Sequence, residues 1–239
     1  AYEAGPQVFK DGSFTVPAGT TLGILGGTGS GKSTLMLLLD KLYRLPEGGG
    51  RITVGGVDIE DIATEHLRKN IAMVLQEPFL FSRTIRENIA IVQPGITQAE
   101  IEAASSDACL NDSIQSFAKG YDTFVGERGV TLSGGQKQRA AIARALTQKA
   151  PIMIFDDSLS AVDNETDAKI RTALQERFGT ATVIIISHRI TTLAKADQVI
   201  VLDGGRIAQE GTPAQLKEQD GIYRKIYDIQ LGIKEGSHE

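Results

Sequence analysis

Short apolar segments alternate along the chain with longer segments in which apolar residues recur every three or four positions. The short segments predict buried strands at 20–26, 71–76, 151–156, 181–187 and 198–205, with further strands at 13–16, 48–56 and 206–211. The longer segments predict helices at 32–45, 134–149, 165–178 and 213–230. Apolar strands that alternate with helices indicate an α/β fold around a mostly parallel sheet.

The middle of the chain departs from this alternation. Over residues 84–120 the pattern is helical throughout, and the strongly helical segment GGQKQRAAIARALTQK follows at 134–149. We therefore predict a separate helical lobe over 84–147, set into a core formed by 1–83 and 148–239. We find no internal repeat and no low-complexity linker in the sequence.

Composition narrows the possible functions. The chain has 239 residues, of which 41% are hydrophobic and 23% charged, and its formal net charge is −5. This balance is typical of globular proteins, and the charges are interspersed without a basic block, so nucleic acid is not an expected partner. Because Cys109 is the only cysteine, a disulfide framework is excluded, and we expect Cys109 to be a packing residue.

The apolar segments are far shorter than the ~20 residues that a membrane-spanning helix needs. The first residues, AYEAGPQVF, lack the pattern of a signal peptide and have the character of a domain edge. We therefore expect the chain to be a fragment whose N-terminal neighbour is missing. His66 and His238 are not placed at the end of a buried strand, and we expect both to be solvated.

The sequence GGTGSGKS, Gly26–Ser33, fits the phosphate-loop pattern G-x-x-x-x-G-K-[ST] between a predicted strand and a predicted helix. Glycines allow successive backbone N–H groups to point toward an anion, and the helix N-terminus adds a positive partial charge. Lys32 can reach the outer phosphates of a nucleotide, and the Ser33 hydroxyl can ligate Mg²⁺. The alternative is a glycine-rich turn without a ligand, and the flanking strand and helix argue against it.

The strand PIMIFD ends in the adjacent acids Asp156 and Asp157. In phosphate-loop folds, an acid at the end of a second strand holds the Mg²⁺ ion, and Asp156 has this placement. A helix cap is the alternative role for an acid at a strand end. For Asp163, which directly precedes NETDAK, capping of the following helix is equally compatible with the sequence.

Together with the phosphate loop and IMIFDD, the sequence LSGGQKQR, Leu132–Arg139, resembles the ATP-binding-cassette (ABC) family over essentially the whole chain. The resemblance implies an α/β P-loop NTPase core with a mixed sheet, an antiparallel β subdomain and a helical lobe that carries the signature sequence. It implies ATP and Mg²⁺ as ligands and ATP hydrolysis as the activity. The start of the signature helix also suits an anion site formed by Ser133 and the N–H groups of Gly134 and Gly135.

The functional positions of the family have counterparts in this sequence. Gln76 resembles the Q-loop glutamine, His188 the switch histidine, and Asp163 the D-loop aspartate. Tyr2 resembles the aromatic residue that stacks on adenine, although an exposed aromatic at a frayed terminus is the alternative. The ATP-binding residues implied by the resemblance are Tyr2, Gly26, Gly27, Thr28, Gly29, Ser30, Gly31, Lys32, Ser33, Thr34 and Gln76. The implied Mg²⁺ ligands are Ser33, Gln76 and Asp156, the implied catalytic residues are Gln76, Asp157 and His188, and the implied signature residues are Leu132, Ser133, Gly134, Gly135 and Gln136.

The resemblance also implies partners. In the family two cassettes pair head to tail, and the LSGGQ of each closes on the nucleotide of the other; taken alone, LSGGQ could mark only a helix start. The segment TFVGERG, Thr123–Gly129, resembles an exporter segment that contacts the membrane domains, and the Gln76 region is implied to contact them as well. A charged surface loop is the plainer interpretation of TFVGERG. The implied location is the cytoplasmic face of the cell membrane, within an exporter.

Position 157 departs from the family's pattern, in which the residue after the metal-binding aspartate is usually a Glu that positions the attacking water. Asp157 keeps the charge, but its arm is shorter by one C–C bond, ~1.5 Å, and a misplacement of about 1 Å can lower a rate ~10²-fold. We therefore expect weak hydrolysis at this chain's own site, which is typical of one chain of a heterodimeric exporter. His188 is retained, and this favours some residual hydrolysis.

Two other functions are compatible with parts of this pattern. A non-transport ABC-type ATPase would carry coiled-coil insertions or a basic surface, which the sequence does not show, and salt-dependent DNA binding would favour it. An ATP-gated binding module would clamp two chains together, with hydrolysis incidental. Single-turnover hydrolysis by the chain separates that module from a transporter ATPase.

Overall fold

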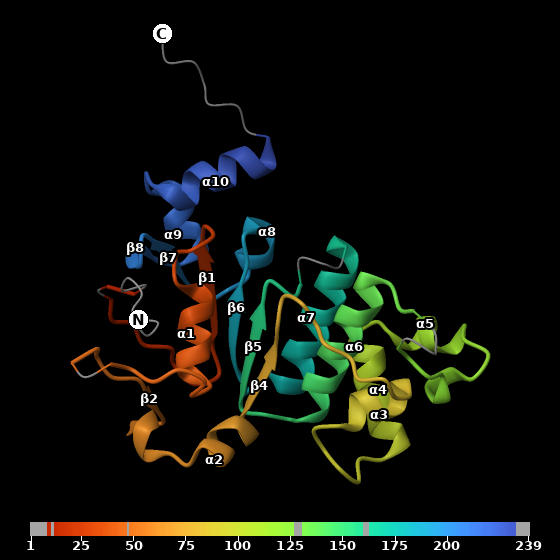
Figure 1. The fold of residues 1–239 in the computed structure, drawn as a ribbon. Helices are drawn as coiled ribbons and strands as arrows, with labels where there is room; N and C mark the ends of the chain where they lie inside the picture. The colour runs from red at the N-terminus through yellow and green to blue at the C-terminus, as the bar shows by residue number, and fades with distance from the viewer. Residues whose placement is uncertain (1–8, 11, 47, 127–130, 160–162, 233–239) are drawn as a thin grey trace. The chain divides into compact units, whose positions relative to one another are not determined.

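The computed structural model describes residues 9–10, 12–46, 48–126, 131–159 and 163–232. The chain divides into two compact units, whose helices and strands are labelled in Figure 1. Unit 1 comprises Ala1–Ile71 and Thr182–Glu239, and unit 2 comprises Ala72–Ala181. Unit 1 therefore contains the phosphate loop and His188, whereas unit 2 contains Gln76, the signature sequence and the paired acids.

Unit 1 is built on strands in the order β6 (Thr182–Ile186), β1 (Thr21–Gly26), β7 (Gln198–Asp203) and β8 (Arg206–Gly211). β1 is parallel to both β6 and β7, whereas β7 and β8 are antiparallel. The register places Gly23 opposite Ile185 on one side and Val199 on the other. β1 and β7 are almost wholly apolar and buried, as expected for strands inside a sheet. The predicted mixed sheet is therefore confirmed.

The helix after the phosphate loop, α1 (Lys32–Leu39), is shorter than the predicted helix at 32–45. Lys41 adopts a left-handed conformation with φ 53°, and its N–H group donates to the Leu38 carbonyl while the N–H of Leu42 donates to that of Leu37. These bonds form a Schellman-type helix end. The remaining elements of unit 1 are β2 (Thr53–Val54), β3 (Val57–Asp58), η1 (Ile59–Asp61), α2 (Thr64–Lys69), α8 (Ile190–Leu193), α9 (Pro213–Glu218) and α10 (Ile222–Leu231).

Three predicted elements of unit 1 need correction. The single strand expected at 48–56 is the first arm of the antiparallel hairpin β2–β3, which turns at Gly55 and Gly56 with φ 59° and 82°. The strand expected at 13–16 is irregular, because its half-buried Phe14 and Val16 pack without a hydrogen-bonded strand partner among the described residues. The closing helix expected at 213–230 is two helices, because the chain becomes extended after α9 and α10 begins only at Ile222.

Unit 2 places most of β4 (Ile71–Val74) beside β5 (Ile152–Asp156) and groups its helices around α6 (Gly134–Thr147). α3 (Ile85–Ala90) and α4 (Gln98–Asp107) both pack on α6, and α7 (Asn164–Phe178) packs on α4. α5 (Asn111–Gln115) and η2 (Gly120–Asp122) pack against each other near α3 and α4. α6 is buried mainly through alanines, which allow its neighbours to approach closely. The proposed boundaries of the helical lobe, 84–147, stay a prediction.

We expect the packing of α9 to contribute strongly to stability. Leu216 of α9 has an exposed fraction of 0%, whereas Leu231 at the end of α10 is 46% exposed. Leu216→Ala should lower the free energy of unfolding by about 2–5 kcal/mol, because it removes buried methyl groups and leaves a cavity. Leu231→Ala, the matched control, should change it by less than about 0.5 kcal/mol. Urea unfolding followed by circular dichroism measures both, and equal effects would contradict the described burial.

Candidate nucleotide-binding site

The phosphate loop joins β1 to α1 within unit 1. Gly29 and Gly31 have φ values of 79° and 104°, in the left-handed region that favours glycine. Gly31 is the N-cap of α1, and among the described residues no side chain caps this helix start. Backbone N–H groups at a helix start need partners from outside the helix, and the helix dipole favours an anion there. Phosphate oxygens can take the role of the missing cap.

The glycines of the loop have two different roles. In the described structure no atom lies within 4 Å of a Cβ built on Gly27 or Gly29, so these positions border open space. A Cβ on Gly26 would instead lie 2.6 Å from Ser30 Oγ and 2.7 Å from the carbonyl oxygen of Leu202. Gly26 therefore allows the loop to pack on β7, while Gly27 and Gly29 leave room for a ligand to approach the backbone.

Lys32 lies against its own loop. Its Nζ donates to the carbonyl oxygens of Gly26 and Gly27, both at 2.7 Å, and lies 3.4 Å from Ser30 Oγ. The charged amine is thereby held at the loop, where the predicted anion would bind. This position allows the amine to exchange carbonyl partners for phosphate oxygens without crossing a large distance.

The predicted Mg²⁺ ligands have suitable chemistry. Ser33, the second residue of α1, is exposed, so its hydroxyl can be reached from outside. Hydroxyl, amide and carboxylate oxygens are the donors that Mg²⁺ prefers, usually alongside nucleotide phosphates and water. Gln76 and Asp156, the predicted amide and carboxylate ligands, both lie in unit 2. Within the described residues, no group of three or more His, Cys, Asp or Glu side chains could hold a metal by itself.

His188 follows β6, and its exposed position lies at the same sheet edge as the phosphate loop. β6 and β1 are parallel, with Ile186 opposite Ile24, so the residues that follow the two strands leave the sheet at the same edge. Ser187, 1% exposed, donates its N–H to the Ile24 carbonyl at 3.1 Å, and its Oγ accepts the N–H of Arg189 at 3.0 Å. The backbone on both sides of His188 is therefore fixed on the strand that carries the phosphate loop.

Asp156 and Asp157 stand at the end of a strand whose middle residues, Met153–Phe155, are buried. Phe155 is 0% exposed, β5 ends at Asp156, and both Asp156 and Asp157 are half-buried. Asp157 has φ 47°, a left-handed conformation that is uncommon outside glycine, although Asp and Asn adopt it more readily than other residues. Such backbone outliers cluster at functional sites. The turn at Asp157 sets the direction in which its carboxylate leaves the backbone.

The signature sequence forms the start of α6, and this start is capped by its own side chains. Ser133 Oγ accepts the N–H of Gln136 at 3.2 Å, and Gln136 Oε1 accepts the N–H of Ser133 at 2.9 Å. This capping box engages the Ser133 hydroxyl that we expected to contact an anion. Gly134 is exposed, and no atom of the described structure lies within 4 Å of a Cβ built on it. A ligand can therefore approach the backbone of α6 at Gly134.

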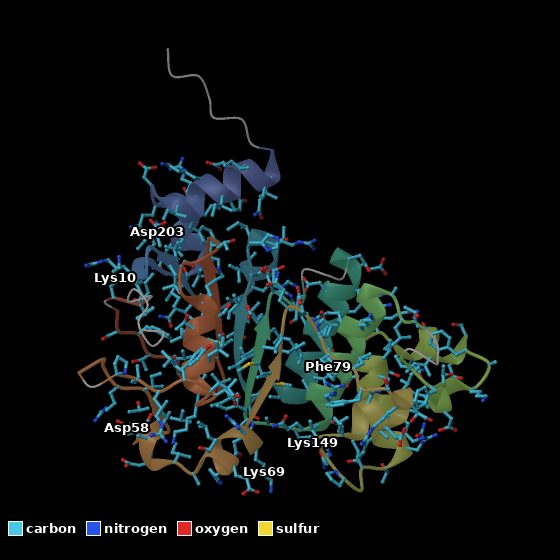
Figure 2. The ribbon with its side chains drawn as sticks, viewed as in Figure 1. Lys10, Asp58, Lys69, Phe79, Lys149 and Asp203 are labelled. Carbon is cyan, nitrogen blue, oxygen red and sulfur yellow. The ribbon has the colours of Figure 1, made fainter. Side chains whose placement is uncertain are left out.

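Gln76 is exposed in residues 75–83, which we call the Q segment and which follow β4. Two side chains of α6 hold the Q segment. Gln138 donates to the Leu75 carbonyl at 3.2 Å, and Arg144 Nη1 donates to the Phe79 carbonyl at 3.0 Å. Phe79, labelled in Figure 2, is itself 68% exposed. α6 therefore carries the signature at its start and holds the Q segment along its length.

Asn88 of α3, 1% exposed, completes this connection. Its side-chain amide accepts the N–H of Phe81 at 2.8 Å and donates to the carbonyls of Phe81 and Thr84 at 2.9 and 3.0 Å. Arg144 Nε donates to the Asn88 carbonyl at 2.8 Å, and its guanidinium lies 6.0 Å over the Phe81 ring. Burial lowers the pKa of Arg144. The sequence does not mark Asn88, Gln138 and Arg144 as partners of the Q segment, because polar residues on amphipathic helices normally face water.

The exporter-like segment lies beside the end of the Q segment. The N–H of Ile85 donates to the Thr123 carbonyl at 3.0 Å, and the N–H of Val125 donates to the Arg83 carbonyl at 2.9 Å. Thr84 and Phe124 form an isolated antiparallel bridge. The two segments expected to contact membrane domains are thus joined through their backbones in unit 2. Residues 127–130 of this stretch lie outside the described residues.

Asp163 is the N-cap of α7. Its carboxylate accepts the N–H and the hydroxyl of Thr166 at 2.9 and 2.7 Å. These bonds, of which the one from the N–H has the larger effect, hold the pKa of Asp163 below its ordinary value. The helix-cap interpretation is confirmed, while the D-loop role stays a prediction. Tyr2, expected to stack on adenine, lies outside the described residues, as do residues 160–162.

Comparison with known proteins identifies the family. The ABC transporter family profile matches residues 9–160, which is more than half of the chain, so the chain belongs to the ABC transporter family. An uncharacterised ABC transporter ATP-binding protein of Sinorhizobium fredii is 42% identical over 231 residues, covering 97% of this chain and 39% of the relative. The ATP-dependent lipid A-core flippase of Aliivibrio fischeri is 42% identical over 229 residues, covering 95% of this chain and 39% of the relative.

A solved structure of a bacterial Atm1-family ABC exporter with ATP bound is similar with a TM-score of 0.91 and 39% identity, covering 96% of this chain and 40% of that one. The fold is therefore that of an ABC ATPase, and the chain is a nucleotide-binding domain close to the exporter type. Such a domain binds ATP, generally with Mg²⁺, and membership of this family implies ATPase activity. The chain spans about two fifths of the length of these relatives. Over the described residues, we find no helix with the length and hydropathy required to cross a bilayer.

We expect Lys32→Ala to weaken Mg·ATP binding by about 10–100-fold or more, because it removes a charged donor worth roughly 1.5–3 kcal/mol from the phosphate loop. Isothermal titration calorimetry measures the dissociation constant. Lys195→Ala is the matched control, because it removes an exposed lysine of the same unit. Unchanged affinity in Lys32→Ala would contradict the assignment of the phosphate loop.

We expect Arg144→Ala to lower the free energy of unfolding by about 1–3 kcal/mol, because it leaves the half-buried Asn88 carbonyl and the Phe79 carbonyl without their charged donor. Arg86→Ala should cost less than about 1 kcal/mol, because the ion pair of Arg86 with Asp122 is exposed. Urea unfolding measures both variants. Hydrogen exchange at residues 79–83 should accelerate in Arg144→Ala alone, and equal behaviour of the two variants would contradict the described connection.

Proposed function

We propose that this chain is the ATP-hydrolysing cassette of an ABC exporter, that it closes head to tail with a second cassette, and that its own hydrolytic site is the weaker one. The observation that carries the last point is Asp157, which stands where the family usually has Glu. The exporter assignment is supported by the similarity to the Atm1-family exporter and the lipid A-core flippase. Export itself belongs to a longer protein with membrane domains.

Nucleotide binding in this proposal uses the phosphate loop. The N–H groups from Gly27 to Ser33 and the amine of Lys32 hold the phosphates, at a helix start that lacks a side-chain cap in the described structure. Ser33, Gln76 and Asp156 would hold Mg²⁺, which neutralises the charge of the outer phosphates when bound. Tyr2 stacks on the adenine ring.

Hydrolysis in this proposal depends on residues after two strands. Asp157 follows β5 and orients the attacking water, and His188 follows β6 and contacts the γ-phosphate. Catalysis of phosphoryl transfer depends chiefly on such positioning and on charge stabilisation. The signature sequence of the second cassette closes over the same nucleotide, while this chain's LSGGQ completes the second cassette's site.

In this proposal the site is weak because the Asp157 side chain is shorter than the usual Glu. The left-handed backbone at Asp157 sets the direction of its Cα–Cβ bond, and a Glu on the same backbone would carry its carboxylate up to ~1.5 Å further. A water held about 1 Å too far from its base can react ~10²-fold more slowly. ATP binding does not require that reach, so binding and hydrolysis separate at this position.

The partner cassette in this proposal is a different chain that supplies Glu at the matching position. The intact LSGGQ start, preformed by the Ser133–Gln136 capping box, is then used at the competent site of the pair. The Q segment and Thr123–Gly129 contact the membrane domains, and the exposed Phe79 and Phe124 offer apolar contacts there. The assembled transporter would lie with its cassettes at the cytoplasmic face of the membrane.

We expect Asp157→Glu to raise hydrolysis at this site about tenfold or more, equivalent to at least ~1.4 kcal/mol of transition-state stabilisation, with nearly constant affinity for ATP. Single-turnover hydrolysis of radiolabelled ATP by the full-length transporter measures the rate, with the partner's phosphate-loop lysine mutated so that only this site turns over. Titration calorimetry on the same variants measures the affinity.

Asp157→Asn is the matched control, because Asn keeps the size of Asp and tolerates the left-handed backbone but carries no charge. It should lower the residual rate further. Hydrolysis by the unmodified chain at the rate of its partner's site would contradict a weak site. An unchanged rate in Asp157→Glu would show that the defect lies elsewhere.

A further inference from the structure

The side-chain amide of Gln230 holds the backbone of the loop that carries His188. Gln230 lies near the end of α10, and its Nε2 donates to the His188 carbonyl at 2.6 Å. Its Oε1 accepts the N–H of Ile190 at 2.8 Å. One amide thus bonds to backbone groups on both sides of Arg189, with its donor and its acceptor each used once.

This contact also replaces a missing helix cap. Ile190 is the first residue of α8, and its N-cap residue Arg189 provides no side-chain cap. The first N–H groups of a helix need partners from outside the helix. Gln230, which is 40 positions away from Ile190 in the sequence, supplies that partner. The His188 loop is therefore completed by a helix that sequence analysis did not connect with it.

The helix α10 is anchored at its other end, so it can act as a fixed support. Tyr223, in its first turn, is 1% exposed, and its N–H donates to Gln209 Oε1 of β8 at 3.0 Å. A Cβ on Gly221 would meet the end of the Gln209 side chain, which would have to move and give up this bond. α10 also packs on α9 and α8 (Figure 1). Tyr223 and Gln230 are seven positions apart in this ten-residue helix, so the anchor on β8 and the contact with the His188 carbonyl lie near its two ends.

We propose that Gln230 is a positioning residue for His188, which fixes the peptide from which the imidazole extends. This inference rests on the proposed role of His188 at the γ-phosphate. Two hydrogen bonds of Ser187, one to the Ile24 carbonyl and one from the Arg189 N–H, hold the backbone before and after His188. The side-chain amide of Gln230 adds two more hydrogen bonds from α10. With the carbonyl of His188 and the N–H of Ile190 both held, rotation of the intervening peptides is restricted. Such restriction lowers the cost of aligning a catalytic side chain.

Variants of Gln230 separate positioning from general stability. Gln230→Met keeps the length of the side chain and a high helix propensity but removes both hydrogen bonds. Gln230→Glu keeps an oxygen that can accept from Ile190 but cannot donate to the His188 carbonyl. Ile229→Ala is the control, because Ile229 is the adjacent residue of α10 and is 77% exposed.

The rate experiment uses the full-length transporter with the partner's phosphate-loop lysine mutated. We expect Gln230→Met to lower single-turnover hydrolysis about 3–30-fold, with ATP affinity within about twofold of the unmodified chain. Gln230→Glu should lie at or near the rate of Gln230→Met, since a carboxylate facing the His188 carbonyl is repelled, and Ile229→Ala should match the unmodified chain. In a His188→Ala background, Gln230→Met should have no further effect on the rate.

Hydrogen exchange provides a readout that does not depend on catalysis. In Gln230→Met, the segment containing Ile190 should exchange at least about fivefold faster, while segments away from α8 and α10 exchange at the rate of the unmodified chain. Unchanged exchange there would overturn the described contact as a restraint in solution. An equal rate loss in the presence and absence of His188 would overturn the proposal that Gln230 acts through His188.

The same experiment distinguishes failure of the proposed function. If His188→Ala leaves the rate unchanged, the role of His188 at the γ-phosphate is wrong, and the positioning role falls with it. If His188→Ala lowers the rate while Gln230→Met does not, the role of His188 stands and the inference about Gln230 is overturned.

Discussion

The start of α1 imposes the constraint on which the proposed site depends. The N-cap of α1 is Gly31, and in the described structure no side chain caps this helix start. The first N–H groups of α1 therefore need acceptors from outside the helix. The start of α6 is the opposite case, because Ser133 and Gln136 satisfy each other's backbone groups. In the proposed site the start of α1 is completed by a ligand, whereas the start of α6 is completed by its own side chains. Nucleotide binding should therefore stabilise unit 1 in proportion to ligand concentration and affinity.

The same need for backbone partners organises the loops around the site. The Q segment and residues 187–190, which carry His188, both contain backbone groups that bond to side chains of a helix distant in the sequence. Side chains from α6 and α10 bond to these groups, through Gln138 and Arg144 in one case and Gln230 in the other. Peptide groups that are held in this way keep loops in one arrangement without further secondary structure. Helices far away in the sequence thus define where the functional loops lie.

Much of the fold and of the candidate site can be predicted from local patterns. The apolar segments of β1, β5, β6 and β7 are long enough to predict strands, and the phosphate loop, signature and paired acids are contiguous motifs. The early end of α1 depends on one left-handed residue, Lys41, which nothing in its neighbourhood specifies. The left-handed turn at Asp157 likewise left no signal in the sequence.

Contacts between distant residues could not be predicted in this way. Arg144 bonds to a carbonyl 65 positions away and Gln230 to one 42 positions away. Both residues lie on helices where glutamine and arginine commonly face water, so composition and periodicity do not distinguish them. Asn88 offers the one weak indication, because it is a polar residue within the otherwise apolar face of α3.

The two anchors on α6 have a mechanical consequence. Gln138 and Arg144 are six residues apart, so their attachment points are separated by ~9 Å along the helix axis. A uniform slide of α6 would carry Leu75 and Phe79 by equal amounts, whereas a tilt about the signature end would displace Phe79 further than Leu75. Such a tilt would rotate the Q segment, and the exposed ring of Phe79 would move furthest. The ratio of the two displacements would be set by the positions of Gln138 and Arg144 along α6, four and ten residues after Gly134.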